Sequence, residues 1–571
     1  MSTVRRFFAV LLVVVLCTMV GTATVPATGQ EQLPVPREET IFLEDRPNIF
    51  VAFDSFNTRI PNGNDFANGY VQVGQEYLFL GNAATGEYEP WLGKSWEYNE
   101  DYTELTIFLQ EAAHWNDGTP FTADDVVFTI LTVRDNTALG GGEVLREFVA
   151  EAEAVDAHTV KLTFTKPAPR FHYELLAMVG GFEIWPKHIW ENQDPTTFKN
   201  NPPVTTAVWK LREVLPDLRM FVWERDDNYW AKDIRFPEAK YIVYREAPAS
   251  PDVDYAEFVA NQIDHAHWIQ YPQMVQAMEE NPKIQIAPYP DPCPRGMWFN
   301  TQRYPLSLPE VRWALSYALD REKIAKFIWQ PETEVALWPW SSWPLLDRFR
   351  FDDVMEEYKI EFDPAKAEAL LDGLGFAKGD DGIRVDGEGN RMAYTIITPL
   401  PVGEYEYQIA QELAEGAANI GIEMTVKHLP QSAFDEATRT GDFDVTSHWL
   451  CWAPLDALQL YQPYTSDQPM PGESASPPNW IGLEDAEFDD AVARLKVINP
   501  DDPAAEAIYK DAFRAWMRLM PVLPVVQTVF VMPWNTTYWE GWPVEGNWYT
   551  LPFTWWPTFA KVPFALKSTQ Q

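Results

Sequence analysis

Segments with the pattern of β-strands alternate with segments with the pattern of α-helices along this chain. Residues 103–110 (TELTIFLQ) alternate apolar and polar side chains, as a half-buried strand does, and residues 158–166 read as another strand that Pro167 stops. Residues 123–133 instead place apolar side chains at helical spacing. Because strands that alternate with helices build sheets covered by helices, the sequence predicts an α/β fold.

The second half of the chain carries the same alternation, with clear helix boundaries. Residues 309–329 have apolar side chains at helical spacing, and residues 406–429 read as a helix followed by a strand. In residues 362–376, Asp363 can cap the free amides of a helix and Pro364 fits its first turn. A helix is therefore expected to begin there.

Length and charge limit the architecture and the partners. The chain has 571 residues, which exceeds the usual size of one hydrophobic core, so we expect two or more lobes. Its formal net charge is −40. Because phosphate backbones bind clustered Lys and Arg, this charge argues against nucleic acid as a partner.

The N-terminus predicts export. A basic segment (MSTVRR) precedes an apolar run at residues 7–20, and small residues follow, as in a secretory signal peptide. The run is short for a membrane span, which needs about 20 residues. We therefore expect a signal peptide at residues 1–27, cleaved after Ala23 or Ala27, and a flexible lead-in at residues 28–40.

The cysteines allow a lipid anchor or one disulfide. Cys17 invites lipidation, but bulky Leu16 stands directly before it, where a lipid-attachment motif has a small residue. After cleavage, Cys293 and Cys451 remain, and their pairing stays open. No later stretch is long and apolar enough to span a membrane, so we expect the mature protein in the periplasm or at the cell surface.

Signatures of catalysis and metal binding are sparse. The chain has no G-x-S-x-G elbow, H-E-x-x-H helix, P-loop or G-x-G-x-x-G turn. His265 and His267 form an H-x-H pair that can ligate a metal, but without further Cys or His nearby two polar surface residues are the favoured interpretation. Residues 386–390 (DGEGN) are similar to a calcium loop, but Arg391 occupies the place of the turn glycine, so a hairpin tip is expected. We therefore expect no metal and no cofactor, with a secreted hydrolase as the weaker alternative.

Residues 105–130 crowd one histidine and several aspartates into a short stretch. Thr122 can cap a helix, and Asp125, three residues later, completes a capping box. Asp124 and Asp125 also suit the positive end of the helix dipole. These acids are therefore expected to shape the backbone, and Asp124→Ala is expected to cost stability and not ligand affinity.

Residues 115–126 (WNDGTPFTADDV) resemble the signature of extracytoplasmic solute-binding proteins of the oligopeptide/dipeptide type, family 5, which serve ABC transporters. Six further segments resemble segments of this family in the same order. They are residues 223–230, 258–268, 297–324, 362–376, 418–426 and 441–445. One such match can arise by chance, whereas seven in the right order cannot.

This resemblance implies a two-lobed periplasmic-binding-protein type II fold with a hinge between the lobes and an additional subdomain at about residues 80–200. Lobe I would comprise residues 41–296 with 527–566, and lobe II residues 297–526. The function implied is capture of a ligand without chemistry and its delivery to the permease subunits of an ABC transporter, by a protein that acts as a monomer. A ligand-presenting receptor subunit for chemosensing differs only in its partner.

Departures from the family pattern bear on the ligand. Peptide binders of the family commonly carry an Asp after a Trp to pair with the α-ammonium of the peptide, whereas this chain has Trp452 and Ala453 at that place. Asp456 can substitute only if the loop shifts. The family's GTGPY segment is also replaced, by residues 204–209 (VTTAVW). Because a buried ammonium needs an anionic partner, these changes favour an oligosaccharide over an oligopeptide.

Tryptophans supply the candidate contacts for such a ligand. Of the 25 tryptophans, 16 lie from Trp298 onward, many of them in segments rich in Pro and Gly where a buried core is a poor explanation. Flat indole faces suit sugar rings, with nearby polar side chains for the hydroxyls. The candidate contacts are Trp449, Trp452, Trp298, Asn300, Asp456, Trp338 and Trp340, with Trp343 in the same group as the last two.

Overall fold

The computed structural model describes residues 34–47, 49–50, 52–60, 68–82, 86–177, 180–267, 269–327, 333–449, 455–474 and 477–570. The expected signal peptide with Cys17 lies outside these residues, as do Trp452 and Cys451. Cys293 is disulfide-bonded.

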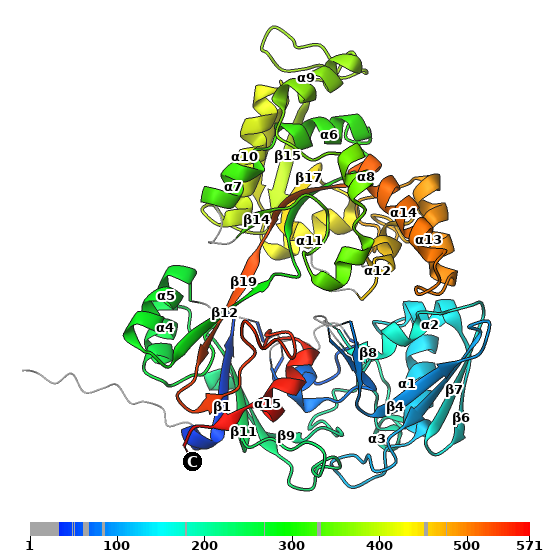
Figure 1. The fold of residues 1–571 in the computed structure, drawn as a ribbon, viewed down its shortest axis with the longest axis vertical. Coiled ribbons are helices and arrows are strands. Elements are labelled where there is room, and N and C mark those ends of the chain that lie inside the picture. Colours follow the sequence, from blue (N-terminus) through cyan, green and yellow to red (C-terminus); the bar gives the residue numbers. More distant parts are fainter. Residues whose placement is uncertain are drawn as a thin grey trace, which may run out of the picture.

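The chain forms two bodies, an upper and a lower one in Figure 1, and both contribute to one hydrophobic cluster. None of the helices in the described part combines the length and the apolar character needed to cross a membrane.

The lower body is built on a four-stranded sheet in the order β1-β11-β10-β9. The strands are β1 (Thr40–Asp45), β9 (Trp209–Leu215), β10 (Met220–Arg225) and β11 (Tyr241–Glu246). β1 runs parallel to β11, whereas β10 is antiparallel to both of its neighbours. The helices α4 (Pro251–Val259) and α5 (Tyr271–Glu280) lie beside this sheet (Figure 1).

Residues 34–40, the described part of the expected lead-in, are tied to the lower body. Val35 is buried, and residues Arg37–Glu39 form a 3-10 turn before β1. Arg37 Nη2 lies 2.7 Å from the Oδ1 atom of the buried Asp264.

A second, antiparallel sheet of the lower body has the order β4-β5-β7-β6. Its strands are β4 (Gly93–Tyr98), β5 (Glu104–Leu109), β6 (Val149–Asp156) and β7 (Thr159–Phe164). The helices α1 (Ala123–Asp135) and α2 (Glu143–Phe148) pack beside it, on the right in Figure 1. This unit falls within residues 80–200, where the sequence resemblance places the additional subdomain, and we refer to it as the subdomain.

The upper body is built on a six-stranded mixed sheet in the order β14-β18-β13-β17-β15-β16. The strands are β13 (Arg295–Phe299), β14 (Glu334–Val335), β15 (Ala393–Thr398), β16 (Glu423–His428), β17 (Val445–Trp449) and β18 (Val522–Gln527). Its helices are α6 (Pro309–Ala318), α7 (Arg321–Phe327), α8 (Asp352–Glu357), α9 (Pro364–Gly373), α10 (Tyr405–Asn419), α11 (Gln431–Thr440), α12 (Leu458–Tyr461), α13 (Ala486–Val497) and α14 (Ala505–Leu519).

Two strands lead from one body to the other. β12 (Ile284–Pro290) precedes β13, and β19 (Val529–Asn535) follows β18. β12 and β19 pair antiparallel over their full length, and Figure 1 shows them as the ribbon that rises from the lower body toward the upper one. The chain therefore crosses twice at the same place, as a hinge requires.

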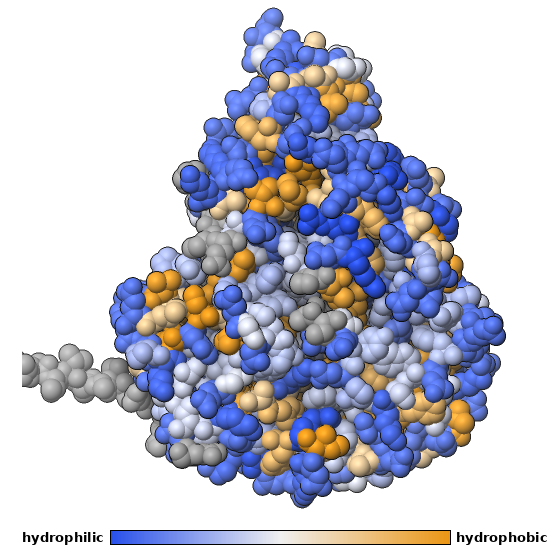
Figure 2. Space-filling model, viewed as in Figure 1, coloured by the Kyte–Doolittle hydropathy of each residue, from blue (hydrophilic) through white to orange (hydrophobic). Residues whose placement is uncertain are grey.

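Short elements complete the lower body. They are β2 (Phe79–Gly81), β3 (Tyr88–Pro90), β8 (Leu176–Ala177), α3 (Lys187–Trp190), β20 (Trp539–Glu540), α15 (Val562–Ala565) and β21 (Lys567–Ser568). Together with the segment between β20 and α15 they bring the C-terminal tail back to the lower body (Figure 1). The face shown in Figure 2 is mostly hydrophilic, with scattered apolar patches, as the net charge of −40 leads one to expect.

The local structure expected for residues 105–130 is confirmed. The Oδ2 atom of Asp125 accepts a 2.9 Å hydrogen bond from the backbone N of Thr122, the residue that precedes α1. Asp125 Oδ1 accepts a further 2.9 Å bond from the backbone N of Lys187. Asp124, in contrast, is exposed and lies 3.5 Å from Lys187 Nζ.

Other expected boundaries are confirmed as well. The Asp363 side chain accepts a bond from the backbone N of Lys366, so it caps α9, and Pro364 is the first residue of that helix. Residues 386–390 form a hairpin tip, in which the backbone N of Asp386 donates to the carbonyl of Asn390 and Gly389 has a φ of +87°. The helical spacing of apolar side chains noted from residue 309 onward corresponds to two helices, α6 and α7, with a break between them. Asp320 accepts a 3.0 Å bond from the backbone N of Lys323 and so caps a second helix.

The surface location expected for His265 and His267 is wrong. His265 is buried and the His267 side chain is only 9% exposed, and their ring centroids lie 5.1 Å from Trp534 and 4.8 Å from Trp555, respectively. Burial lowers the pKa of His265 to about 3 and that of His267 to about 4. The sequence does not show the burial of this pair because the aromatic residues that cover it come from the far end of the chain. Among the described residues there is no group of three or more His, Cys, Asp or Glu side chains that could hold a metal.

Candidate binding site between the two bodies

A hydrogen-bond network fixes the two crossing segments to each other. The backbone N of Asp291 donates to the carbonyl of Thr528 over 2.9 Å, and the hydroxyl of Thr528 donates to Asp291 Oδ2 over 2.8 Å. Arg295 Nη1 lies 3.2 Å from the same oxygen. Burial raises the pKa of Asp291, although the Arg295 guanidinium opposes this shift. The two strands therefore enter the upper body as one unit, which defines an axis for movement of the bodies.

A buried charge cluster links this hinge to the end of β17. Arg295 Nε lies 3.4 Å from Glu406 Oε1, and His448 Nδ1 lies 2.8 Å from Glu406 Oε2. The Arg295 guanidinium carbon lies 5.9 Å from the ring centroid of Trp449, the last residue of β17. Trp449 is partly exposed and its ring lies beside that of His448, at 3.7 Å. An indole held in this way next to the hinge can offer a flat face to a ligand.

The other described tryptophan candidates are buried in the upper body. Trp298, Trp338, Trp340 and Trp343 are at most 4% exposed, so the expectation that a buried core is a poor explanation for these tryptophans is wrong. Their role as ligand contacts stays a prediction. A chain of rings connects two of them, because Trp298 contacts Tyr464, Tyr464 contacts Trp516, and Trp516 contacts Trp340, with centroid distances of 5.4, 5.4 and 5.9 Å. The structure thus brings Trp298 and Trp340 into one aromatic cluster, although 42 positions separate them in the sequence (340 minus 298).

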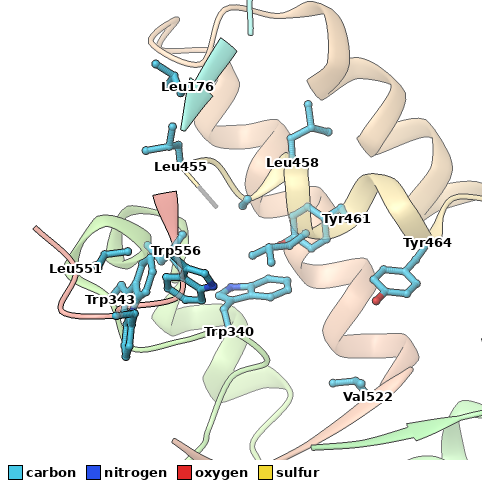
Figure 3. Packing of buried hydrophobic residues seen from close by; sticks show 14 of the residues in the cluster. Leu176, Trp340, Trp343, Leu455, Leu458, Tyr461, Tyr464, Val522, Leu551 and Trp556 are labelled. Carbon is cyan, nitrogen blue, oxygen red and sulfur yellow. The ribbon is translucent and has the colours of Figure 1, made fainter. Parts of the chain in front are cut away.

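The aromatic cluster reaches the lower body through its edge at Trp340 and Trp343. Figure 3 shows these two rings in one packed group with Trp556 and Leu551 of the C-terminal tail, and all four residues belong to the same hydrophobic cluster. Trp343 Nε1 donates a 3.1 Å bond to the carbonyl of Pro290, the last residue of β12. Closure of the two bodies therefore buries these indoles against the tail.

Two further tryptophans were not among the expected contacts. Trp548 and Trp555 are both partly exposed and lie in the tail of the lower body. The Tyr289 ring lies 6.3 Å from Trp343 and 4.9 Å from Trp548, so it joins the aromatic groups of the two bodies. Trp555 lies 5.1 Å from Phe530, at the start of β19. The high density of aromatic residues in the tail is the sequence signal that could have indicated Trp548 and Trp555 as candidate contacts.

The side chain of Asn300 forms hydrogen bonds within the upper body. Its Nδ2 atom donates to the carbonyls of Gly441 and Phe443 over 3.0 and 3.1 Å, and its Oδ1 atom accepts from the backbone N of Gln302. These bonds use both amide hydrogens. Its role as a ligand contact stays a prediction, as does that of Trp452, which lies outside the described residues.

Asp456 is buried and fully engaged. Its Oδ2 atom accepts bonds from Arg170 Nε over 2.7 Å and from the Tyr509 hydroxyl over 2.6 Å, and its Oδ1 atom accepts from the backbone N of Leu458 over 2.8 Å. The side chain is 0% exposed. Its charge is therefore balanced by an arginine from the lower body.

A pocket of about 390 Å³ lies along α11, within the upper body alone. Arg303, one of its two basic lining residues, is paired with Asp442 and Asp444 at 3.1 and 2.7 Å. Because this pocket does not join the two bodies, it does not have the location that capture by closure requires.

Two α/β bodies joined by paired crossing strands, with aromatic side chains between them, define a bilobal solute-binding protein. A family model described as bacterial extracellular solute-binding proteins, family 5, middle part, matches residues 87–472. The chain belongs to this family of binding proteins and is not an enzyme. Its place outside the cytoplasm follows from the family.

Curated relatives of the chain carry several ligand descriptions. The dipeptide-binding protein of Escherichia coli is 26% identical over 316 residues, which cover 52% of this chain and 56% of that protein. This chain thus matches little more than half the length of that relative. The periplasmic alpha-galactoside-binding protein of Rhizobium meliloti is 25% identical over 421 residues, or 65% of this chain and 58% of that protein.

Solved structures establish the fold. A mannohexaose-bound periplasmic oligopeptide-binding protein of an oligopeptide ABC transporter from Thermotoga maritima matches with a TM-score of 0.77 at 24% identity, covering 94% of this chain and 100% of that chain. The oligopeptide-binding protein AppA of Bacillus subtilis, in complex with a nonapeptide, matches with a TM-score of 0.71 at 20% identity, covering 93% and 98%. The type II periplasmic-binding-protein fold is therefore confirmed.

Proposed function

We propose that this chain captures an oligosaccharide between its two bodies and delivers it to the permease subunits of an ABC importer. The observation that carries the choice of ligand is the state of Asp456. An α-ammonium group that is buried without an anion loses several kcal/mol of hydration, on the order of the cost of an isolated buried charge. The acid that the sequence offered for this purpose is already neutralised by Arg170.

The accessible aromatic surface supports the same choice. Trp449 in the upper body and Trp548 and Trp555 in the lower body are partly exposed. Apolar ring faces bind the C–H faces of sugars, whereas the hydroxyls need polar partners around the rim. The mannohexaose complex of the Thermotoga maritima protein and the name of the Rhizobium meliloti relative point the same way.

An oligopeptide remains the second candidate, because relatives described as dipeptide- and oligopeptide-binding proteins match this chain. A peptide would need another anion for its N-terminus. The nearby carboxylate Glu406 lies 3.4 Å from Arg295, so it is already paired with a cation.

We further propose lobe boundaries at the crossing segments. The resemblance places lobe I at residues 41–296 with 527–566 and lobe II at 297–526. The ends of β12 and β13 suggest a change of lobe between residues 290 and 295, and those of β18 and β19 a second change at Thr528. A signal peptide at residues 1–27, a periplasmic or cell-surface location and a monomeric state belong to the same proposal. The net charge of −40 supports the expectation that nucleic acid is not a partner.

A thermal-shift panel on the mature chain tests the proposal. Manno-, cello- and xylo-oligosaccharides form one half of the panel, and di- to nonapeptides the other. A ligand at about 100 times its Kd stabilises the folded state by roughly 2.7 kcal/mol, which is a clear shift in Tm. We expect at least one sugar series to raise the Tm and to be recovered intact, and a shift with peptides alone would contradict the proposal.

A further inference from the structure

The side chain of Arg170 passes from the lower body into the upper body. Arg170 directly precedes the 3-10 turn Phe171–Leu175, next to β8, and its side chain is 8% exposed. Its Nε atom donates to Asp456 Oδ2 over 2.7 Å, and its Nη2 atom donates to the Tyr509 hydroxyl over 2.7 Å. Its Nη1 atom donates to two carbonyls, those of Leu495 and Ile498. Within the described residues, every hydrogen bond of this guanidinium goes to the upper body.

These two carbonyls lie at the C-terminal end of α13 (Ala486–Val497). The last carbonyls of a helix have no partner within the helix and carry the negative end of its dipole. A basic side chain that binds them is a favourable cap. A helix end of the upper body is thus completed by a residue of the lower body.

Two further contacts lie at the same seam. Asn499 Nδ2 donates a 2.6 Å bond to the hydroxyl of Tyr102, and Lys496 Nζ lies 3.8 Å from Glu147 Oε1. Tyr102 and Glu147 belong to the subdomain. We name these contacts the clasp; its members are Tyr102, Glu147 and Arg170 from the lower body and Asp456, Leu495, Lys496, Ile498, Asn499 and Tyr509 from the upper body.

The clasp and the hinge lie at opposite sides of the molecule. In Figure 1 the paired strands β12 and β19 run at the left of centre, whereas the subdomain and α13 approach each other at the right. Rotation about the hinge therefore separates the members of the clasp. On opening, the guanidinium loses all of the hydrogen bonds described above at once, and Asp456 loses its cation.

We propose that Arg170 holds the two bodies closed in the absence of ligand. It acts as a positioning residue that sets the fraction of closed molecules, and it does not touch the ligand. The affinity of a closed-state ligand falls in proportion to that fraction. The effect on ligand affinity rests on the proposed function. The closure of the ligand-free protein by Arg170 does not depend on that function.

Small-angle X-ray scattering of the ligand-free protein tests the clasp. Arg170→Gln removes the charge and the fork of donors. The matched control is Arg212→Gln, which breaks the exposed pair of Arg212 with Glu224 between β9 and β10 (3.0 Å). We expect a larger radius of gyration for Arg170→Gln than for the wild-type protein and no change for Arg212→Gln. Equal radii for all three proteins would overturn the proposal.

A milder variant, Tyr509→Phe, tests the clasp even if Arg170→Gln does not fold. Tyr509→Phe removes only the bond to Arg170 and that to Asp456 and keeps the ring, which packs 4.6 Å from Phe349. We expect a radius between those of the wild-type protein and Arg170→Gln, with an unchanged near-UV circular dichroism spectrum. A folded Tyr509→Phe with the wild-type radius, found together with an Arg170→Gln that does not fold, would also overturn the proposal.

Calorimetry with mannohexaose as the probe adds the functional consequence. If the wild-type protein binds it, we expect a Kd about tenfold higher for Arg170→Gln and an unchanged Kd for Arg212→Gln. Equal Kd values for Arg170→Gln and the wild-type protein would contradict the clasp. If no variant binds any oligosaccharide, the proposed function fails, while the scattering comparison still decides on the clasp.

Discussion

Arg170 Nε lies 2.7 Å from Asp456 Oδ2, across 286 positions of sequence and across the seam between the two bodies. This pair serves two tasks at once. It removes Asp456 from the set of carboxylates that can receive a ligand's ammonium group, and it connects the subdomain to the upper body. The ligand class and the closed conformation therefore depend on the same contact.

The first prediction concerns the stability that this pair provides. Asp456→Asn leaves the Arg170 charge buried without its counter-charge, and breaking a buried pair costs about 3 kcal/mol of unfolding free energy. Urea unfolding measures this loss. The control Asp490→Asn disrupts an exposed pair with Arg494 and is expected to cost less than about 1 kcal/mol. Similar losses of unfolding free energy for both variants would show that the pair of Arg170 and Asp456 stabilises the fold no more than an exposed pair does.

The second prediction separates the two adjacent acids of α1. Asp125→Ala removes the cap of Thr122 and the acceptor of the Lys187 amide, so we expect a loss of about 2–3 kcal/mol in unfolding free energy. Asp124→Ala removes only an exposed contact and is expected to cost less than about 1 kcal/mol. Neither variant should change ligand affinity. A folded Asp124→Ala that no longer binds ligand would disprove the structural role.

The third prediction follows from the buried histidines. The unfolded chain protonates each imidazole near its ordinary pKa of 6.5, whereas the folded state stays neutral down to about pH 4 for His267 and about pH 3 for His265. Below pH 6.5 the unfolded state therefore binds more protons, and stability falls as the pH falls. Each histidine contributes a loss of about 2–3 kcal/mol between pH 7 and pH 4.5.

The variant His267→Asn isolates this effect. The decrease in unfolding free energy between pH 7 and pH 4.5 should be about 2–3 kcal/mol smaller than in the wild-type protein. The exposed His428 supplies a control variant, His428→Asn, which replaces a histidine and leaves His265 and His267 in place. An identical pH dependence in His267→Asn and the wild-type protein would contradict the buried, neutral state of His267.

Local signals in the sequence were sufficient for much of the fold. Thr122 with Asp125, and Asp363 with Pro364, mark their helices because capping involves residues only a few positions apart. The apolar spacing continues through Asp320 and so does not mark the break there, whereas the bond from the backbone N of Lys323 to Asp320 in the structure shows that a second helix begins.

Long-range contacts limited the description of the site. The burial of His267 depends on Trp555, and the engagement of Asp456 depends on Arg170; neither partner is near in sequence. The concentration of tryptophans in segments rich in Pro and Gly argued against a buried core, and this is wrong for most of the described candidates. It could not show which indoles are buried, such as Trp343, and which are partly exposed, such as Trp449.

The fourth prediction compares two of the candidate contacts. Trp449→Ala removes an accessible ring beside the hinge and is expected to weaken oligosaccharide binding by about tenfold or more, with little change in stability. Asn300→Ala removes bonds to two carbonyls and is expected to lower the unfolding free energy by about 1–2 kcal/mol without changing affinity. Calorimetry and urea unfolding on both variants check this. The reverse pattern would place the ligand at Asn300 and not at Trp449.

Calorimetric titration of the mature wild-type chain, first with mannohexaose and the manno-, cello- and xylo-oligosaccharides and then with peptides, tests the central claim most directly. We predict saturable binding at one site for an oligosaccharide series, no saturable heat with peptides, and unchanged sugars at the end of the titration. Saturable binding of peptides with none of any oligosaccharide would contradict the assignment of the ligand and would require another anion for the peptide's ammonium group.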